Sequence, residues 1–183
     1  MQINNSFSKS TTFGMALKIT PKAHKALEQT SLEVLDKLQK AGEALKDTKY
    51  CHLEIGEKLR PRIDFPYASS YIAPFQPVKP KPSDSILEIK TTWDGTDVAG
   101  IRKGQSYKAC LLFDNPEQAA EAYAKINALD SDLDRAVELT KMFDNKEIKD
   151  EADRAAKREL DAKIKTAALD LIKKFGADAH EKP

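Results

Sequence analysis

The chain has 183 residues, of which 40% are hydrophobic and 32% charged, and its formal net charge at pH 7 is +1. This length suits one ordinary domain with an appendage, and a near-neutral charge favours no class of partner. No apolar run approaches the roughly 20 residues that a membrane-spanning helix needs, so we expect no membrane segment. The N-terminus lacks the basic start and apolar core of a signal peptide. Cys51 and Cys110 are too few and too far apart for a disulfide framework, which predicts two reduced, buried thiols in a cytoplasmic protein.

The N-terminal part predicts a tail, a short strand and one long helix. Residues 1–12 are polar and are expected to be disordered. Residues 13–19 are typical of a weak strand added to a sheet. Thr20 followed by Pro21 is a good start for a helix over 20–46, because Thr caps helices and Pro suits the first position. Its apolar seam comprises Leu27, Ser31, Val34, Leu38, Ala41 and Leu45.

Residues 49–55 and 59–65 each alternate apolar and polar side chains, which predicts two half-buried strands. Pro61 lies in the second and cannot donate to a strand ladder, so we expect that strand at an edge of the sheet. Six of the nine prolines fall between positions 61 and 82. The segment 66–82 therefore favours a long extended connection, held against the body by its aromatic rings.

Residues 85–114 are expected to form the centre of the sheet as three antiparallel strands. The first strand alternates between two faces, and the third covers 107–113. Asp94-Gly95 favours a type I′ hairpin turn, and Gly104 can supply positive φ in a second turn. The residues expected to face the core from the first strand are Leu87, Ile89, Thr91 and Trp93.

Three helices are predicted towards the C-terminus. Asn115 caps the first, Ser131 caps the second, and Asp144-Asn145 is expected to be a turn. Residues 146–175 then suit one long helix, in which thirteen of the first twenty residues are charged. Its last turns carry an apolar face made of Ile164, Ala168, Leu171 and Phe175, and Gly176 ends it.

No constellation of residues predicts catalysis, a cofactor or a metal. The candidate metal ligands lack the spacing of known sites. The glycines form no phosphate-binding loop, and neither cysteine nor any serine has a nucleophile signature around it. We therefore predict a protein that is not an enzyme and binds no cofactor. The ligand candidates considered were His24, His52, His180, Cys51 and Cys110.

Basic and aromatic residues are interleaved over 58–82, which is typical of surfaces that attract phosphates and stack bases. The alternative is that the rings are buried and the cations keep a sheet edge soluble. Nucleic-acid binding is accordingly a second hypothesis. Its candidate residues are Arg60, Arg62, Tyr67, Tyr71, Lys79 and Lys81.

The sequence as a whole predicts the α+β class, with an antiparallel sheet of about four to six strands packed with one N-terminal helix and two to three C-terminal helices. The expected parts are a tail (1–12), an α+β domain (13–145) and a charged C-terminal helical arm (146–183). The favoured function is a non-catalytic, cytoplasmic interaction or inhibitor-type protein that binds an unidentified protein partner or itself. We expect the apolar face of the arm to dock on the sheet, or, if it does not, to bind that partner. A nucleic-acid-associated protein is the alternative, and a small enzyme comes third.

Overall fold

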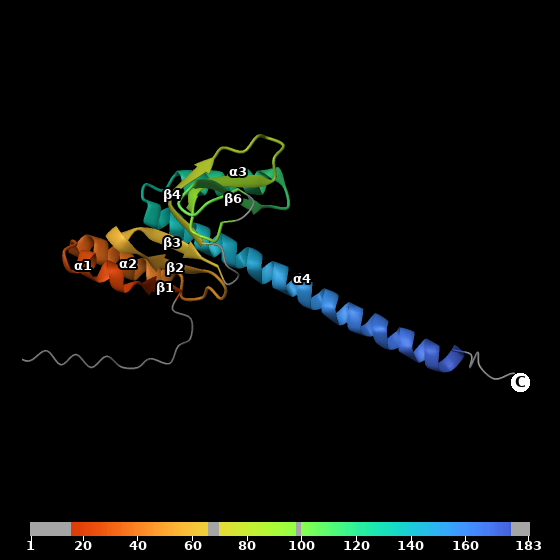
Figure 1. The fold of residues 1–183 in the computed structure, drawn as a ribbon. Helices are drawn as coiled ribbons and strands as arrows, with labels where there is room; N and C mark the ends of the chain where they lie inside the picture. The colour runs from red at the N-terminus through yellow and green to blue at the C-terminus, as the bar shows by residue number, and fades with distance from the viewer. Residues whose placement is uncertain (1–15, 66–69, 98–99, 177–183) are drawn as a thin grey trace, which may run out of the picture. The chain divides into compact units, whose positions relative to one another are not determined.

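The computed structural model describes residues 16–65, 70–97 and 100–176 (Figure 1). The predicted tail 1–12 and the first residues of the predicted strand 13–19 lie outside these ranges. The chain divides into two compact units, Met1–Asn145 and Lys146–Pro183, which are described separately. The α+β class is confirmed.

The described residues of the first unit form one sheet of six strands, in which each strand lies next to its neighbour in the sequence. Strands β2 to β6 pair antiparallel, whereas β1 pairs parallel with β2, so the sheet is mixed and not wholly antiparallel as predicted. The physical reason is that two helices connect β1 to β2 and return the chain to the same end of the sheet. The strands are β1 (Leu17–Ile19), β2 (His52–Ile55), β3 (Pro61–Asp64), β4 (Ser70–Val78), β5 (Ile86–Trp93) and β6 (Ser106–Leu112).

The single N-terminal helix of the prediction is two helices, because Ser31 begins a new one. Its Oγ accepts the backbone N–H of Val34 at 3.4 Å, so Ser31 is a cap and not a member of an apolar seam. Asn115 caps its helix as predicted and accepts the N–H of Gln118 at 2.9 Å. The helices are α1 (Pro21–Glu28), α2 (Leu32–Ala44), the short 3₁₀ helix η1 (Glu57–Leu59), α3 (Pro116–Asn127) and α4 (Asp132–Phe175).

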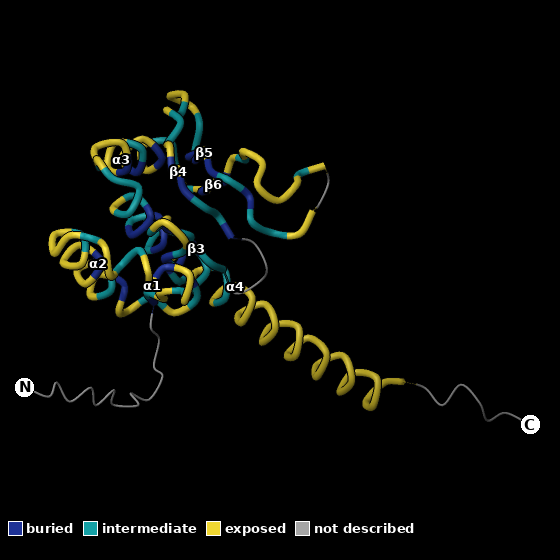
Figure 2. The backbone as a smooth tube through the Cα atoms, turned by 60° about the vertical axis from the view of Figure 1, so that its left-hand side comes forward, coloured by how far each residue is buried: buried dark blue, intermediate teal, exposed yellow. Residues whose placement is uncertain are grey.

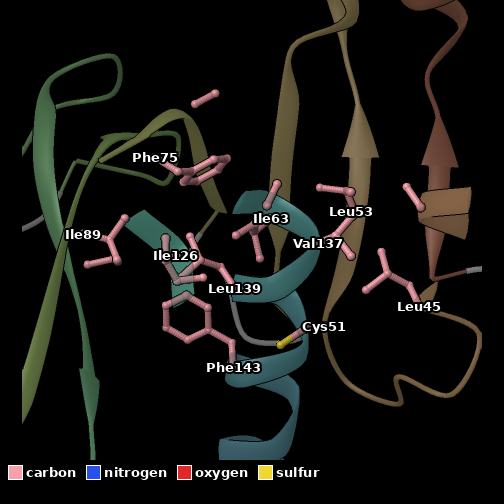
Figure 3. Close-up of a cluster of buried hydrophobic side chains, with 14 of the residues drawn as sticks. Leu45, Cys51, Leu53, Ile63, Phe75, Ile89, Ile126, Val137, Leu139 and Phe143 are labelled. Atoms are coloured by element: carbon pink, nitrogen blue, oxygen red, sulfur yellow. The ribbon is translucent and has the colours of Figure 1, made fainter. Parts of the chain in front are cut away.

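One face of the sheet and all four α-helices share a single hydrophobic core (Figure 3). The alternation in β5 is confirmed, since Leu87, Ile89, Thr91 and Trp93 are all buried. The core therefore covers one side of the sheet, and we call the other side the open face. Central core residues include Leu45, Leu53, Ile63, Phe75, Ile89, Ile126, Leu139 and Phe143.

Helix α4 does not break at Asp144, where a turn was predicted. The Asp144 carboxylate is buried and accepts the backbone N–H groups of Lys49 (3.0 Å), Tyr50 (2.6 Å) and Cys51 (2.8 Å). The side chain thus bonds to the segment that enters β2 and leaves its own helix intact, which is why its turn-forming tendency has no effect here.

In the part of 85–114 that the structure describes, two strands are found where three were predicted. Strands β5 and β6 pair directly, and the described residues between them, 94–97 and 100–105, hold no further strand. Gly104 has the predicted positive φ of 83°, but Gly95 does not adopt the left-handed conformation that a type I′ turn requires. Gly95 is needed for space instead, because a Cβ there would lie 2.4 Å from Cζ2 of Trp93.

The proline-rich segment is a strand and not a loose connection. Strand β4 lies between β3 and β5, so β3 is an interior strand and the prediction of an edge was wrong. Pro61 is tolerated because it is the first residue of β3. The ladder of β4 changes register between Ile72 and Gln76, which accommodates Pro74. There the N–H of Phe75 donates to Asp132 Oδ1 at 3.0 Å.

The two cysteines differ from each other, and no disulfide joins them although the structure describes both. Cys51 is buried as predicted, whereas Cys110 is exposed. The prediction was wrong for Cys110 because strand alternation places it opposite the buried Ala109 and Leu111, on the open face.

Candidate functional site

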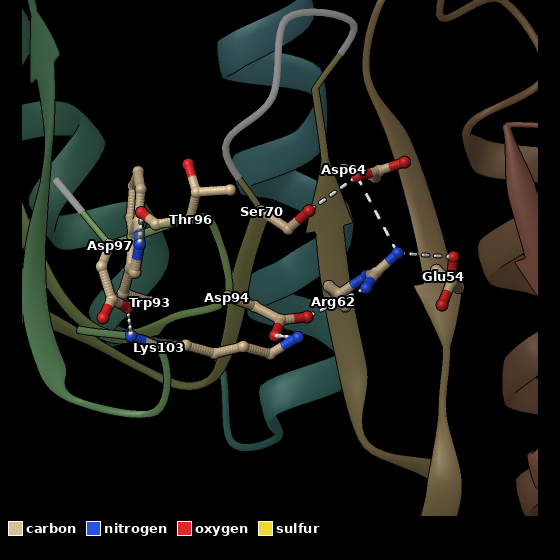
Figure 4. A network of polar contacts seen from close by, with 9 residues as sticks. All are labelled: Glu54, Arg62, Asp64, Ser70, Trp93, Asp94, Thr96, Asp97 and Lys103. Atoms are coloured by element: carbon tan, nitrogen blue, oxygen red, sulfur yellow. Dashed lines mark hydrogen bonds and ion pairs between the residues drawn. The ribbon is translucent and has the colours of Figure 1, made fainter.

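The open face of the sheet carries a cluster of charged side chains centred on Arg62, which we call the Arg62 cluster (Figure 4). Arg62 Nη2 lies 2.9 Å from Glu54 Oε2, and Arg62 Nη1 lies 2.9 Å from Asp94 Oδ2. Lys103 Nζ contacts the second oxygen of Asp94 at 3.0 Å, and Asp64 lies 3.9 Å from Arg62. Strands β2 and β3 and the loop after β5 are thereby linked.

The register of the sheet explains why these residues meet. Glu54 and Arg62 are direct partners in the β2–β3 ladder. Their neighbours Leu53 and Ile63 are buried in the core, so strand alternation places Glu54 and Arg62 on the open face. Opposite charges on directly opposed strand residues stabilise such a pairing.

Electrostatics at Asp94 follow from two opposing effects. Burial alone would raise the pKa of the Asp94 carboxyl, but hydrogen bonds from Lys103 and Arg62 outweigh it and lower that pKa. Asp94 is therefore ionised and paired at neutral pH. The cluster neutralises most of its own charge, so we interpret it as a structural connection between strands.

A hollow of about 560 Å³ lies beside the Arg62 cluster. Lys58 lines the hollow with a positive φ of 58°, and the next residue, Leu59, has a φ of 57°. Residues other than glycine adopt this conformation at some cost. Arg60, which also lines the hollow, donates from Nη2 to the backbone oxygen of Ala73. Arg60 thus links the end of this turn to β4, and the hollow is lined by both cations and carboxylates.

The residues predicted to bind nucleic acid do not form one surface. Tyr67 lies outside the described residues. The ring of Tyr71 is on the core side, stacked against Tyr107 with a centroid distance of 6.1 Å, and burial raises the pKa of its phenol to about 12. Arg60 and Arg62 make the contacts described above.

Lys79 and Lys81 lie elsewhere, on a separate hollow of about 730 Å³ at the turn between β4 and β5. Arg62 pairs with Ile72 in the β3–β4 ladder. Lys79 follows seven residues later in the sequence, a separation of roughly 20 Å along an extended strand. The structure therefore separates the two pairs of cations.

The second candidate surface is in the C-terminal unit, where α4 presents an apolar stripe. Leu160 (57% exposed), Ile164 (58%), Leu171 (59%) and Phe175 (69%) are all open to solvent. Figure 2 colours this C-terminal part of α4 as exposed. With 100° per residue, these side chains fall on one side of the helix, together with Ala167 and Ala168. We call these six residues the apolar stripe. Leu160 and Ala167 were not among the predicted residues, although their spacing from Ile164 is helical.

Ion pairs along the helix stabilise it without burial. Glu151 Oε2 lies 2.9 Å from Arg154 Nε, and Glu151 Oε1 lies 2.5 Å from Arg158 Nη2. Hydrogen bonds from Arg158 and Arg154 lower the pKa of the Glu151 carboxyl. Lys163 pairs with Glu159 at 2.6 Å. Such pairs between neighbouring turns support an exposed helix over residues 147–163.

Within the described ranges, no three His, Cys, Asp or Glu side chains are grouped so that they could hold a metal ion, and His180 lies outside those ranges. No helix in the same ranges is long and apolar enough to cross a membrane. Comparison with protein-family models, with curated proteins and with solved structures finds no match.

Proposed function

We propose that the protein is a non-catalytic interaction protein of the cytoplasm, and that helix residues 146–175 are its partner-binding element. The observation that carries the proposal is the exposed apolar stripe. Four large apolar side chains recur in helical spacing on one side of an exposed helix, which is typical of a face that another protein covers.

The free energies of burial and of association support an interface of modest affinity. Covering a Leu, Ile or Phe side chain contributes roughly 1.5–3 kcal/mol. Association costs about 4–15 kcal/mol in lost freedom, before any side chain is ordered. Four such side chains therefore offset the cost only narrowly, which suits reversible regulation, including the inhibitor type of function. The cytoplasmic location is proposed because no disulfide joins the two cysteines.

Nucleic-acid binding is the weaker candidate. It requires rings that can stack on bases beside a row of cations. The Tyr71 ring packs against Phe65, Trp93, Tyr107 and Phe143, and the cations are divided between two places.

The test is affinity capture from the native host with the full chain as bait, with and without nuclease. Leu171→Asp places a charge in the stripe. Leu169→Asp is the matched control, because Leu169 is 48% exposed and lies about 200° around the helix from Leu171. We expect a protein that the parent and Leu169→Asp retain and Leu171→Asp loses. Capture that is equal for all three baits, or that disappears with nuclease, contradicts the proposal.

A further inference from the structure

We propose that the apolar stripe pairs with the stripe of a second copy of this chain, with the two helices antiparallel. This inference rests on the proposed function and names its partner. It comes from three features of the stripe: the spacing of its side chains, the sizes of the residues that would meet, and the charges beside them.

The spacing matches a short coiled-coil seam. Leu160, Ile164, Ala167 and Leu171 recur at steps of four, three and four residues. Lys157 and Lys174 occupy the next positions of the same seam and bound it at both ends. The seam is therefore about 18 Å long. A helix pair of that length buries less than the roughly 1,200 Å² of a standard interface, so we expect a dissociation constant in the micromolar range.

Side-chain sizes favour the antiparallel arrangement. It places Leu160 opposite Leu171 of the second copy, and Ile164 opposite Ala167 of the second copy, in four layers related by a two-fold axis. Each Ile then fills the space that the facing Ala leaves. A parallel pair would instead set Ala167 against Ala167, which leaves a void, and Ile164 against Ile164 in the next layer.

The flanking charges favour the same arrangement. In the antiparallel pair, Lys163 of each copy faces Asp170 of the other, giving two ion pairs across the seam. In a parallel pair, Lys163 faces Ala168 and Asp170 faces Phe175, so neither charge is matched. Within the described part of the chain Asp170 makes no ion pair, and Lys163 contacts only the exposed Glu159. Both side chains can therefore turn to a partner.

The experiment is sedimentation of the full chain up to about 200 μM, a range that detects micromolar dimers. We expect the parent and Leu169→Asp to form dimers and Leu171→Asp to stay monomeric. Lys163→Asp and Asp170→Lys should each weaken the dimer about 10-fold, because each turns two attractive pairs into two repulsive ones.

Mixing the two charge-reversal variants distinguishes an antiparallel helix pair from a parallel one. Lys163→Asp and Asp170→Lys, when combined, form a mixed antiparallel dimer in which both pairs are attractive again, so we expect the mixture to associate as tightly as the parent. A mixture no tighter than its components overturns the antiparallel pairing. A monomeric parent overturns self-pairing altogether, yet the proposed function still stands if a different protein is captured through Leu171. If the parent is monomeric and no protein is captured through Leu171, both proposals are wrong.

Discussion

Replacing Asp144 tests whether one buried carboxylate fixes the start of β2 to helix α4. Oδ1 of Asp144 accepts the N–H groups of Lys49, Tyr50 and Cys51, while Oδ2 accepts only that of Lys49. In Asp144→Ala the exposed Lys49 N–H can bond to water, but the buried Cys51 N–H cannot. An unsatisfied buried donor costs about 1–3 kcal/mol, and each bond to a charged acceptor contributes about 1.5–3 kcal/mol. We expect Asp144→Ala to lower the free energy of unfolding by about 3–5 kcal/mol.

Asp144→Asn should cost less, about 1–2 kcal/mol, because an amide oxygen in the Oδ1 position keeps the Tyr50 and Cys51 bonds. Urea unfolding followed by the fluorescence of Trp93, the single tryptophan, measures both values. Asp153→Ala is the control, since Asp153 is an exposed acid on the same helix and should change stability by about 0.5 kcal/mol or less. If Asp144→Ala is as stable as the parent, or if the Asn and Ala variants lose the same stability, the Asp144 carboxylate does not fix the start of β2.

Three further outcomes are expected. Trp93→Ala should lower the free energy of unfolding by about 3–5 kcal/mol, as other large core truncations do, and a melting temperature within a degree or two of the parent would disprove this. The folded state lowers the pKa of Asp94 below its ordinary 3.8, so the stability that Asp94 contributes is present above about pH 4 and is lost as the pH falls through the folded pKa. In urea unfolding at a series of pH values, Asp94→Asn should therefore lose less stability on acidification than the parent. A thiol reagent should modify Cys110 in the native protein and Cys51 only after unfolding. The Cys110 reaction should be faster at alkaline pH, because the thiolate is the reactive form and partial desolvation of this exposed side chain raises the pKa of its thiol. Equal rates for the two cysteines would contradict the structure.

Local patterns predicted the elements whose residues act on their immediate neighbours. The alternation of Leu87, Ile89, Thr91 and Trp93 identified the core face of β5, because strand period is a property of the backbone itself. Asn115 was identified as a cap for the same reason, since it bonds three residues ahead in its own chain.

The predictions that were wrong concern residues whose contacts lie in distant segments of the chain. Asp144 was interpreted as a turn residue because its partners lie more than 90 positions away in the sequence. Pro61 indicated an edge strand because nothing local reveals that it would be the first residue of an interior one. Gly95 signalled a turn, whereas its role is to leave room for the Trp93 ring.

The two candidate sites also differ in whether they depend on local spacing or on contacts between distant segments. The apolar face of the C-terminal helix could be found from spacing alone, since the helix forms its own backbone hydrogen bonds and its period fixes which side chains share a face. The Arg62 cluster could not, because it depends on the register of β2 with β3 and on the loop that brings Asp94 to them. The basic and aromatic residues of 58–82 were separated for the same reason, when β4 placed Tyr71 in the core.

We propose that the C-terminal helix beyond Asn145 serves association and not the stability of the α+β unit. A chain that ends at Asn145 tests it directly, with thermal unfolding followed by Trp93 fluorescence and molar mass measured by light scattering. We expect the melting temperature to stay within a degree or two of the full chain, while self-association and partner retention are lost. A large fall in melting temperature would instead mean that the helix is part of the core, and unchanged association would mean that the chain associates through residues 1–145 and not through the apolar stripe.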